Sequence, residues 1–257
     1  MTKPEPTSGA QSLHRAVAIL RLVAANAQSG IRLSELCKRT GLARTTVHRM
    51  LGALVGEGLV EQDADTDLYH LGREAWLMGL AAQGRFGMET VAAATLARIS
   101  AQSGDIALFL VRSGTHAVCI AREEGSYPVR THTAQVGGRY PLGVGGGSLA
   151  ILSACPDDEI DWILDSNSAE LARDHPRLTP ALLREMVAQA RVRGYALNPG
   201  LVYPESWGLG LPFHDRQGMV RGAIMLAGVP ARIEPRAAEV AQLLRDEVPR
   251  LEARLYR

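Results

Sequence analysis

Two short amphipathic segments lie on either side of Gly41. Apolar residues recur at helical spacing in both segments, which predicts helices over 34–39 and 44–55. Glycine adopts the left-handed conformation that ends a helix with little strain, so Gly41 marks a tight turn between the two helices. The second helix is expected to bury Val47, Met50, Leu51 and Leu54. A short helix, a tight turn and a second helix form the arrangement of a helix-turn-helix.

The outward side of the second predicted helix is polar and basic. It consists of Thr45, His48, Arg49 and Gly52, with Arg44 and Thr46 at the N-terminal edge. The N-terminal end of such a helix can enter the major groove of DNA, where arginine bonds a guanine edge and threonine contacts phosphate or a thymine methyl group. The alternative interpretation is an ordinary solvent-facing helix, whose polar side needs no partner.

The distribution of charge favours the DNA-binding interpretation. The chain of 257 residues has a net charge of only +1. Residues 11–52, however, contain seven basic residues and one acidic residue, Glu35. A local basic block is typical of a surface that binds a polyanion. We expect Arg44 to contact a base edge and Lys38 or Arg39 to contact phosphate, within a predicted DNA-binding set of Arg32, Lys38, Arg39, Arg44, Thr45, Thr46, His48 and Arg49.

A hairpin and a first helix complete this N-terminal part. Strands are predicted over 59–61 and 68–71, joined by turn residues 64–67, which makes the motif a winged helix-turn-helix. The wing tip carries Asp63, Asp65 and Asp67. These carboxylates would repel phosphate, so we expect the wing to be structural or to lie away from the DNA backbone. The first helix is predicted over 12–27, with an apolar stripe of Leu13, Val17, Leu20 and Ala24, widened by Ile19 and Val23.

The rest of the chain alternates between helix and strand patterns. An Ala- and Leu-rich stretch predicts a linker helix over 72–84 that offers Trp76, Leu77, Met78 and Leu80 for packing. Further helices are expected over 89–103, from Pro156, between Pro180 and Gly194, and over 235–247, where Pro249 would kink or end the last one. Strands are expected over 106–111, 117–121, 127–133, 195–202, 207–214 and 219–227. Hairpins interleaved with helices predict the α+β class, an antiparallel sheet flanked by helices.

These elements predict a disordered leader over 1–10, a winged helix-turn-helix domain over 11–71, a linker helix over 72–87 and a larger domain over 88–257. The leader has no apolar core, so it does not resemble a signal peptide. No apolar stretch reaches the ~20 residues that a membrane span requires. Three scattered cysteines, Cys37, Cys119 and Cys155, favour reduced thiols in the cytoplasm over disulfides or a zinc site. We therefore expect a cytoplasmic protein without a metal, a cofactor or a membrane partner.

A glycine-rich stretch over 142–148 is the most conspicuous local feature of the larger domain, with four glycines in five residues. Such a stretch lets the backbone approach a ligand, and the helix that follows points free amides at it. It lacks the ending of a phosphate-binding P-loop, and Ser148 occupies the last glycine position of the dinucleotide pattern. It is also one residue short of G-x-S-x-G, because Ala150 replaces the last glycine. An effector-site loop, a plain turn before a helix and a catalytic elbow all remain open.

Taken together, these segments resemble the IclR family of bacterial transcriptional regulators. The resemblance lies in QSLHRAVAILRLV, LSELCKRTGLARTTVHRMLGALVGEGLV and YHLGREAWLMG, and further along in GGRYPLGVGGGSLAIL, LTPALLREMVAQARVRGYAL and LPFHDRQGMVRGAIMLAG. It extends from about Gln11 to the final helix. It implies an effector-responsive repressor or activator that binds operator DNA as a dimer or tetramer, with a linker helix and a GAF-like effector domain.

The resemblance also implies an effector pocket between the glycine-rich stretch, the strand before it and the last strands. The corresponding positions are Val129, His132, Tyr140, Gly146, Gly147, Asn198, Gly208, Met225 and Ala227. The family often has hydroxyl, acidic and thiol groups at some of these places, whereas this chain has glycine, asparagine, methionine and alanine. We therefore expect a larger or more apolar effector than a small keto acid, namely an aromatic or hydroxylated aromatic acid.

Directional contacts to such an acid would come from His132, Tyr140 and Asn198, and the loop amides would bind its carboxylate. The alternative for Met225 and Ala227 is plain core packing, which base rates favour for Met225. Two rival functions remain at this point. One is a serine hydrolase that uses Ser148, with His175 or His214 as a conceivable base, and the other is a DNA-binding scaffold without a small-molecule input.

Overall fold

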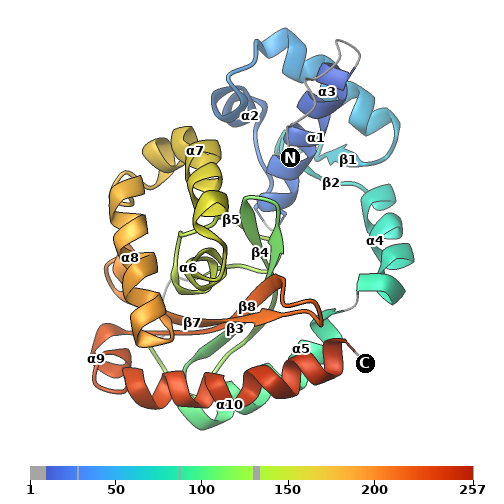
Figure 1. Ribbon diagram of the computed structural model, residues 1–257. Helices are drawn as coiled ribbons and strands as arrows, with labels where there is room; N and C mark the ends of the chain where they lie inside the picture. The colour runs from blue at the N-terminus through green and yellow to red at the C-terminus, as the bar shows by residue number, and fades with distance from the viewer. Residues whose placement is uncertain (1–9, 28, 87, 130–133, 257) are drawn as a thin grey trace. The chain divides into compact units, whose positions relative to one another are not determined.

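The computed structural model describes residues 10–27, 29–86, 88–129 and 134–256. The chain forms two compact units, Met1–Gly87 and Met88–Arg257 (Figure 1). Each unit has its own hydrophobic core, so each is described by itself. Within the described ranges, no helix is long and apolar enough to cross a membrane.

The first unit is a winged helix-turn-helix, as predicted. Its elements are α1 (Ala10–Ala25), α2 (Leu33–Thr40), α3 (Arg44–Gly56), the hairpin β1 (Val60–Gln62) and β2 (Tyr69–Leu71), and α4 (Arg73–Phe86). Gly41 ends α2 with a φ of +67°, and its N–H donates to the carbonyl of Cys37. The glycine therefore forms the predicted tight turn before α3.

The apolar stripe predicted for the first helix is partly wrong. α1 buries Ile19 and Val23, whereas Leu13 is 65% exposed. The hydrophobic cluster of this unit reaches only the second half of α1, where Leu20 and Leu22 pack against it. Because this cluster does not extend to the first turns of α1, apolar spacing there does not produce burial.

The second unit is a six-stranded antiparallel sheet between two helical layers, which confirms the predicted α+β class. The strands are β3 (Ile106–Ser113), β4 (His116–Glu123), β5 (Arg139–Pro141), β6 (Ala196–Tyr203), β7 (Ser206–His214) and β8 (Val220–Gly228), in the order β5-β4-β3-β8-β7-β6. One face packs on α5 (Met88–Ser103) and α10 (Ala237–Leu255), where Phe109 and Phe213 stack with ring centroids 5.0 Å apart. The short helix α9 (Pro230–Ile233) joins β8 to α10.

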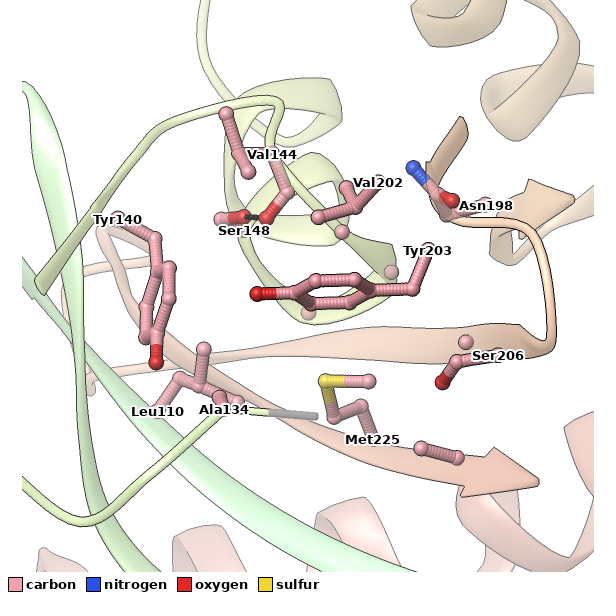
Figure 2. A pocket seen from close by; sticks show the side chains of 15 residues that line it. Leu110, Ala134, Tyr140, Val144, Ser148, Asn198, Val202, Tyr203, Ser206 and Met225 are labelled. Atoms are coloured by element: carbon pink, nitrogen blue, oxygen red, sulfur yellow. Dashed lines mark hydrogen bonds between the residues drawn. The ribbon is translucent and has the colours of Figure 1, made fainter. Parts of the chain in front are cut away.

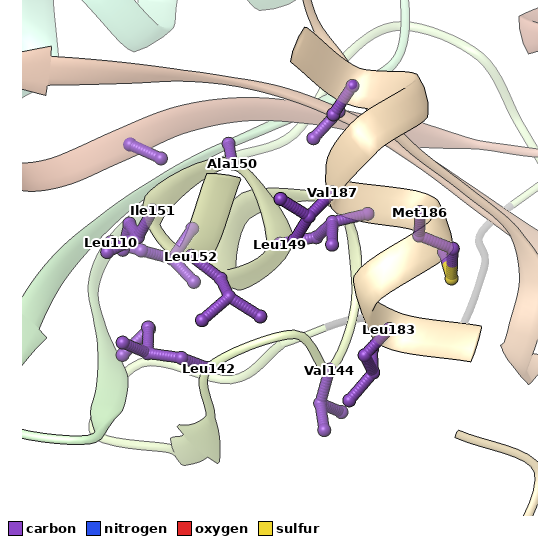
Figure 3. Close-up of a cluster of buried hydrophobic side chains, with 14 of the residues drawn as sticks. Leu110, Leu142, Val144, Leu149, Ala150, Ile151, Leu152, Leu183, Met186 and Val187 are labelled. Carbon is purple, nitrogen blue, oxygen red and sulfur yellow. The ribbon is translucent and has the colours of Figure 1, made fainter. Parts of the chain in front are cut away.

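The other face of the sheet carries α6 (Gly146–Ser153), α7 (Asp157–Asp174) and α8 (Pro180–Arg193). Every residue of α6 from Gly146 to Leu152 is buried, because the helix lies between the sheet and the outer helices (Figure 3). Leu149 and Leu152 of α6 and Leu183 of α8 belong to one hydrophobic cluster. α6 is therefore the central element of this half of the core.

Two element predictions for this unit are wrong. The segment 127–129 is not a strand, and 130–133 lie outside the described residues. The guanidinium carbon of Arg232 instead lies 4.0 Å from the centroid of the Tyr127 ring, so this ring makes a cation–π contact. The final helix continues past Pro249 to Leu255, so the predicted end at 247 is wrong, whereas a kink at Pro249 stays a prediction. Two residues before the proline, Glu247 accepts hydrogen bonds from Arg98 of α5 and from Arg250.

Candidate DNA-binding surface and effector cavity

The outward side of α3 is an exposed polar surface. Val47, Met50, Leu51 and Leu54 are buried as predicted. Because these residues face the core, the opposite side is turned to solvent. Arg44, Thr45, His48 and Arg49 are all exposed, while Thr46 is half-buried. The helix thus presents an arginine and a threonine at its very start, where base readout by such a motif takes place.

The basic residues of α2 lie close to the turn that leads into α3. Lys38 and Arg39 are exposed in the last turn of α2, and Arg32 is exposed at its N-cap position. Arg39 forms an ion pair with Glu35, with 2.8 Å between Nε and Oε1. This pair neutralises part of the charge of Arg39, so Lys38 offers phosphate the stronger attraction of the two.

The wing has a well-formed acidic tip. The carboxylate of Asp63 accepts hydrogen bonds from the N–H groups of Asp65 and Thr66, at 3.0 and 2.8 Å, and from the Thr66 hydroxyl at 2.8 Å. These bonds, first of all the one from the Thr66 hydroxyl, hold the pKa of Asp63 below its usual value. Asp63 therefore builds the turn, whereas no such set of bonds surrounds the Asp65 carboxylate among the described residues.

The wing and the start of α3 are electrostatically linked through Tyr69 of β2. Burial raises the pKa of the Tyr69 phenol, the carboxylate of Asp67 raises it further, and the guanidinium of Arg44 lowers it. Both charged groups therefore act on the same hydroxyl. An anion that approaches Arg44 is thus within electrostatic range of Asp67.

The glycine-rich stretch brings α6 directly onto the sheet. Gly145 has a φ of +84° and forms the N-cap of α6. A Cβ atom on Gly146 would lie 2.4 Å from the carbonyl oxygen of Gly208 in β7. The glycine is therefore required for the close approach of helix and strand, and the stretch is more than a plain turn.

A cavity of about 60 Å³ lies where the start of α6 meets β6, β7 and β8 (Figure 2). Seven predicted effector-site residues line it: Tyr140, Gly146, Gly147, Asn198, Gly208, Met225 and Ala227. Val129 is exposed and is not among the lining residues, and His132 lies outside the described residues. Val144, Gly145 and Ser148 of the predicted effector-site loop also line it. The other lining residues were not predicted: Leu110, Ala134, Val202, Tyr203 and Ser206.

Asn198 is the most informative polar group of the cavity. The residue is only 2% exposed. Its Oδ1 accepts a hydrogen bond from the N–H of Leu201, but its Nδ2 is buried and has no hydrogen-bond partner among the described residues. A buried amide without a partner is costly, so this donor favours a ligand that brings an acceptor.

Two of the other lining residues, Ser148 and Tyr140, carry hydroxyls with different roles. The Ser148 hydroxyl donates to the carbonyl of Val144, so its oxygen is left as an acceptor. Tyr140 accepts a hydrogen bond from the N–H of Gln135, and burial raises the pKa of its phenol. Tyr140 therefore keeps its proton at neutral pH and can donate it to a ligand. No charged side chain occurs in the described part of the lining.

The described lining of the cavity also contains no base for Ser148. His214 lies in a separate open hollow beside Glu252, where the ring Nδ1 is 3.6 Å from the carboxylate. His175 caps α7, and burial lowers its pKa. General-base activation of a serine requires a group within hydrogen-bond reach of its hydroxyl. The geometry around Ser148 suits the binding of a small polar molecule better than nucleophilic catalysis.

Comparison with known proteins finds the same family for both units of the chain. Residues 12–64 match the IclR helix-turn-helix domain, and residues 81–252 match the C-terminal domain of the bacterial transcriptional regulator IclR. The chain is 29% identical to the HTH-type transcriptional regulator BhcR of Paracoccus denitrificans, over 89% of this chain and 81% of that protein.

Solved structures show the same fold. An IclR-type regulator from Silicibacter matches with a TM-score of 0.78 and 21% identity, over 95% of each chain. An IclR homologue from Microbacterium hydrocarbonoxydans, solved in complex with 4-hydroxybenzoate, matches with a TM-score of 0.70 and 23% identity, over 95% of this chain and 98% of that one.

Proposed function

This chain belongs to the IclR family of bacterial transcriptional regulators, and we propose that it binds operator DNA in the cytoplasm in response to a small aromatic acid. The observation that carries the proposal is the exposed N-terminal end of α3, with Arg44 and Thr45 turned to solvent above a buried apolar side. Arg44 would contact a base edge, and Lys38, Arg39 and Arg32 would contact phosphate. The proposed function needs neither a metal nor a cofactor.

The chemistry of the cavity supports an acid with an apolar body. The buried Nδ2 of Asn198 offers a donor to a carboxylate oxygen, and the N-terminus of α6 at Gly146 and Gly147 favours negative charge. Met225, Leu110 and Ala227 provide an apolar wall for a ring. Because the described lining contains no cationic side chain, a single carboxylate suits it better than a dianion. The bound 4-hydroxybenzoate of the Microbacterium homologue supports the same class.

The proposed mechanism is a coupling between the cavity and the DNA-binding surface. The acid would favour one arrangement of the effector domains, and α4 would transmit it to the winged domains. A coupling of about 1–3 kcal/mol, or about 5–150-fold in operator affinity, is typical of such regulators. The coupling is tested by titrating a labelled operator with the protein, with and without benzoate or 4-hydroxybenzoate, and comparing the operator affinities. Operator binding that no acid alters would instead support a DNA-binding scaffold without an effector.

We further propose that α4 contacts a second copy of the chain. Trp76, on this helix, is 61% exposed, and Leu77, Met78 and Leu80 are exposed beside it. An exposed apolar surface of this kind favours association. A second copy fits because a helix-turn-helix protein commonly binds two half-sites as a dimer.

The oligomeric state tests this part of the proposal. Sedimentation analysis of Trp76→Ser/Leu80→Ser is expected to show a dissociation constant at least ~10-fold above that of the wild type. Val192→Ser is the matched control, because Val192 is an exposed apolar residue on α8. An unchanged mass distribution for the α4 variant would rule out this interface.

A further inference from the structure

Tyr203 occupies the middle of the effector cavity. It ends β6, and Figure 2 shows its ring reaching across the cavity, with Tyr140 beyond its hydroxyl end and Met225 on the side of the sheet. The hydroxyl is close enough to Tyr140 to raise the pKa of that phenol. The side chain is nevertheless 47% exposed. Tyr203 therefore lines the cavity and also faces solvent.

The volume of the cavity shows that the position of the Tyr203 ring limits the size of a bound ligand. About 60 Å³ is available with Tyr203 in place. A cavity that holds benzene measures about 150 Å³. The enclosed space beside the Tyr203 ring is therefore too small to bury a second aromatic ring completely, whereas an acid of two or three carbons needs less room.

The backbone that carries Tyr203 is built differently from the strands around it. β6 pairs with β7 up to Pro199 and again at Tyr203, and residues 200–202 between them form a bulge without strand partners. Gly200 has a φ of +73°, which allows this bulge. Two side chains hold it: Asn198 accepts the N–H of Leu201 at 3.0 Å, and Arg177 donates to the carbonyl of Gly200 at 3.4 Å.

We propose that Tyr203 is a plug that determines which acids enter the cavity, an inference that rests on the proposed function. The ring closes the cavity to aromatic acids until the bulge at 200–202 moves it outward. The move would also disturb the bond between Asn198 and Leu201 and so let the Asn198 side chain turn its Nδ2 donor towards the carboxylate. Tyr203 thus selects ligands by size, and Asn198 recognises their charge.

Stopped-flow binding of benzoate, 4-hydroxybenzoate and 2-naphthoate to the full-length protein tests the proposal. Tyr203→Ala is expected to raise the association rate constant of benzoate at least ~10-fold and to admit 2-naphthoate, while the association rate constant of pyruvate changes little. Tyr203→Phe keeps the ring and should therefore exclude 2-naphthoate as the wild type does. Glu205→Ala is the matched control, since Glu205 is exposed in the same hairpin and does not line the cavity.

The outcomes are distinguishable. Equal rate constants for wild type and Tyr203→Ala, or weaker binding of aromatic acids by the variant, would overturn the plug and leave the proposed effector class intact. If neither the wild type nor any variant bound an acid while all retained the wild-type melting temperature, the effector class itself would fail, and the plug with it.

Discussion

The side-chain oxygen of Asn198 accepts a hydrogen bond from the backbone N–H of Leu201 at 3.0 Å, while the amide nitrogen of the same side chain remains buried without a partner in the described part of the chain. One residue therefore supports the bulge of β6 and also offers a donor to the cavity. These two roles can be separated by substitution.

The substitution Asn198→Asp should separate support of the β6 bulge from hydrogen-bond donation to the cavity. The carboxylate retains an acceptor for Leu201 but removes the donor and adds a negative charge next to the bound acid. We expect the affinity for benzoate to fall at least ~10-fold, equivalent to about 1.4 kcal/mol. Calorimetric titration measures this, and a melting temperature close to that of the wild type shows that the bulge persists. Unaltered affinity would mean that the carboxylate does not bind at Asn198.

Arg44 and Lys38 should differ in how their loss affects DNA binding. Arg44→Ala is expected to cost about 1–3 kcal/mol on the operator and to relax the preference at one base pair. Lys38→Ala should weaken binding to all DNA sequences alike and reduce the magnitude of the slope of log K against log salt by about 1. Arg39→Ala should have a smaller effect than Lys38→Ala, because Arg39 is paired with Glu35. Equal loss of specificity in the Arg44 and Lys38 variants would contradict these roles.

The acidic wing should weaken non-specific DNA binding. Asp65→Asn/Asp67→Asn removes two negative charges and leaves Asp63 to hold the turn. We expect several-fold tighter binding to random duplex at low salt, with the gain shrinking as salt rises. Asp158→Asn/Asp165→Asn on α7 changes the net charge equally in the other unit and serves as the control. The same gain in both variants would show that only net charge matters.

Glu247 should make the second unit sensitive to acid. It is 1% exposed, and its carboxylate lies 2.6 Å from Arg98 and 2.8 Å from Arg250. Burial acts to raise the pKa of Glu247, but these hydrogen bonds outweigh it and hold the pKa below 4.5. Because the pKa of Glu247 is lower in the folded state than in the unfolded chain, its ionised carboxylate stabilises the fold fully at pH values above 4.5. This stabilisation is lost as the pH falls below 4.5 and through the pKa of the folded state.

Urea unfolding at about pH 7 and about pH 3.5 tests this linkage. Arg98→Met should lower the free energy of unfolding by about 2 kcal/mol at neutral pH, because it leaves a buried carboxylate with one partner. The loss should be much smaller at the acidic pH. Glu239→Gln, which removes an exposed pair with Arg236, should change the stability little. A pH-independent effect of Arg98→Met would contradict the ion-pair explanation.

Local signals allowed much of the fold to be predicted. Gly41 and Gly194 end helices in the left-handed conformation, and Thr179 caps α8 by accepting the N–H of Leu182. Each of these signals acts within a few residues, so the sequence alone reveals it. β5 was missed because, unlike β1 and β2, it is not joined to its partner by a short turn and is defined only by its pairing with β4.

The cavity was predictable only in part, for the same reason. Family resemblance located Asn198 and Gly208, but no pattern marked Tyr203. Its position depends on the bulge at 200–202, which is a property of the pairing between β6 and β7. Leu13 is the opposite case, since its spacing predicted burial and the tertiary structure leaves it exposed.

The most direct measurement is the affinity of the full-length protein for DNA from its own promoter region and for random duplex of equal length, at the same physiological salt concentration. We predict at least ~10³-fold tighter binding to a site in the promoter fragment, and a preference that Arg44→Ala reduces by at least ~10-fold. Equal affinity of the wild type for both duplexes would contradict the claim that the exposed end of α3 reads a DNA sequence.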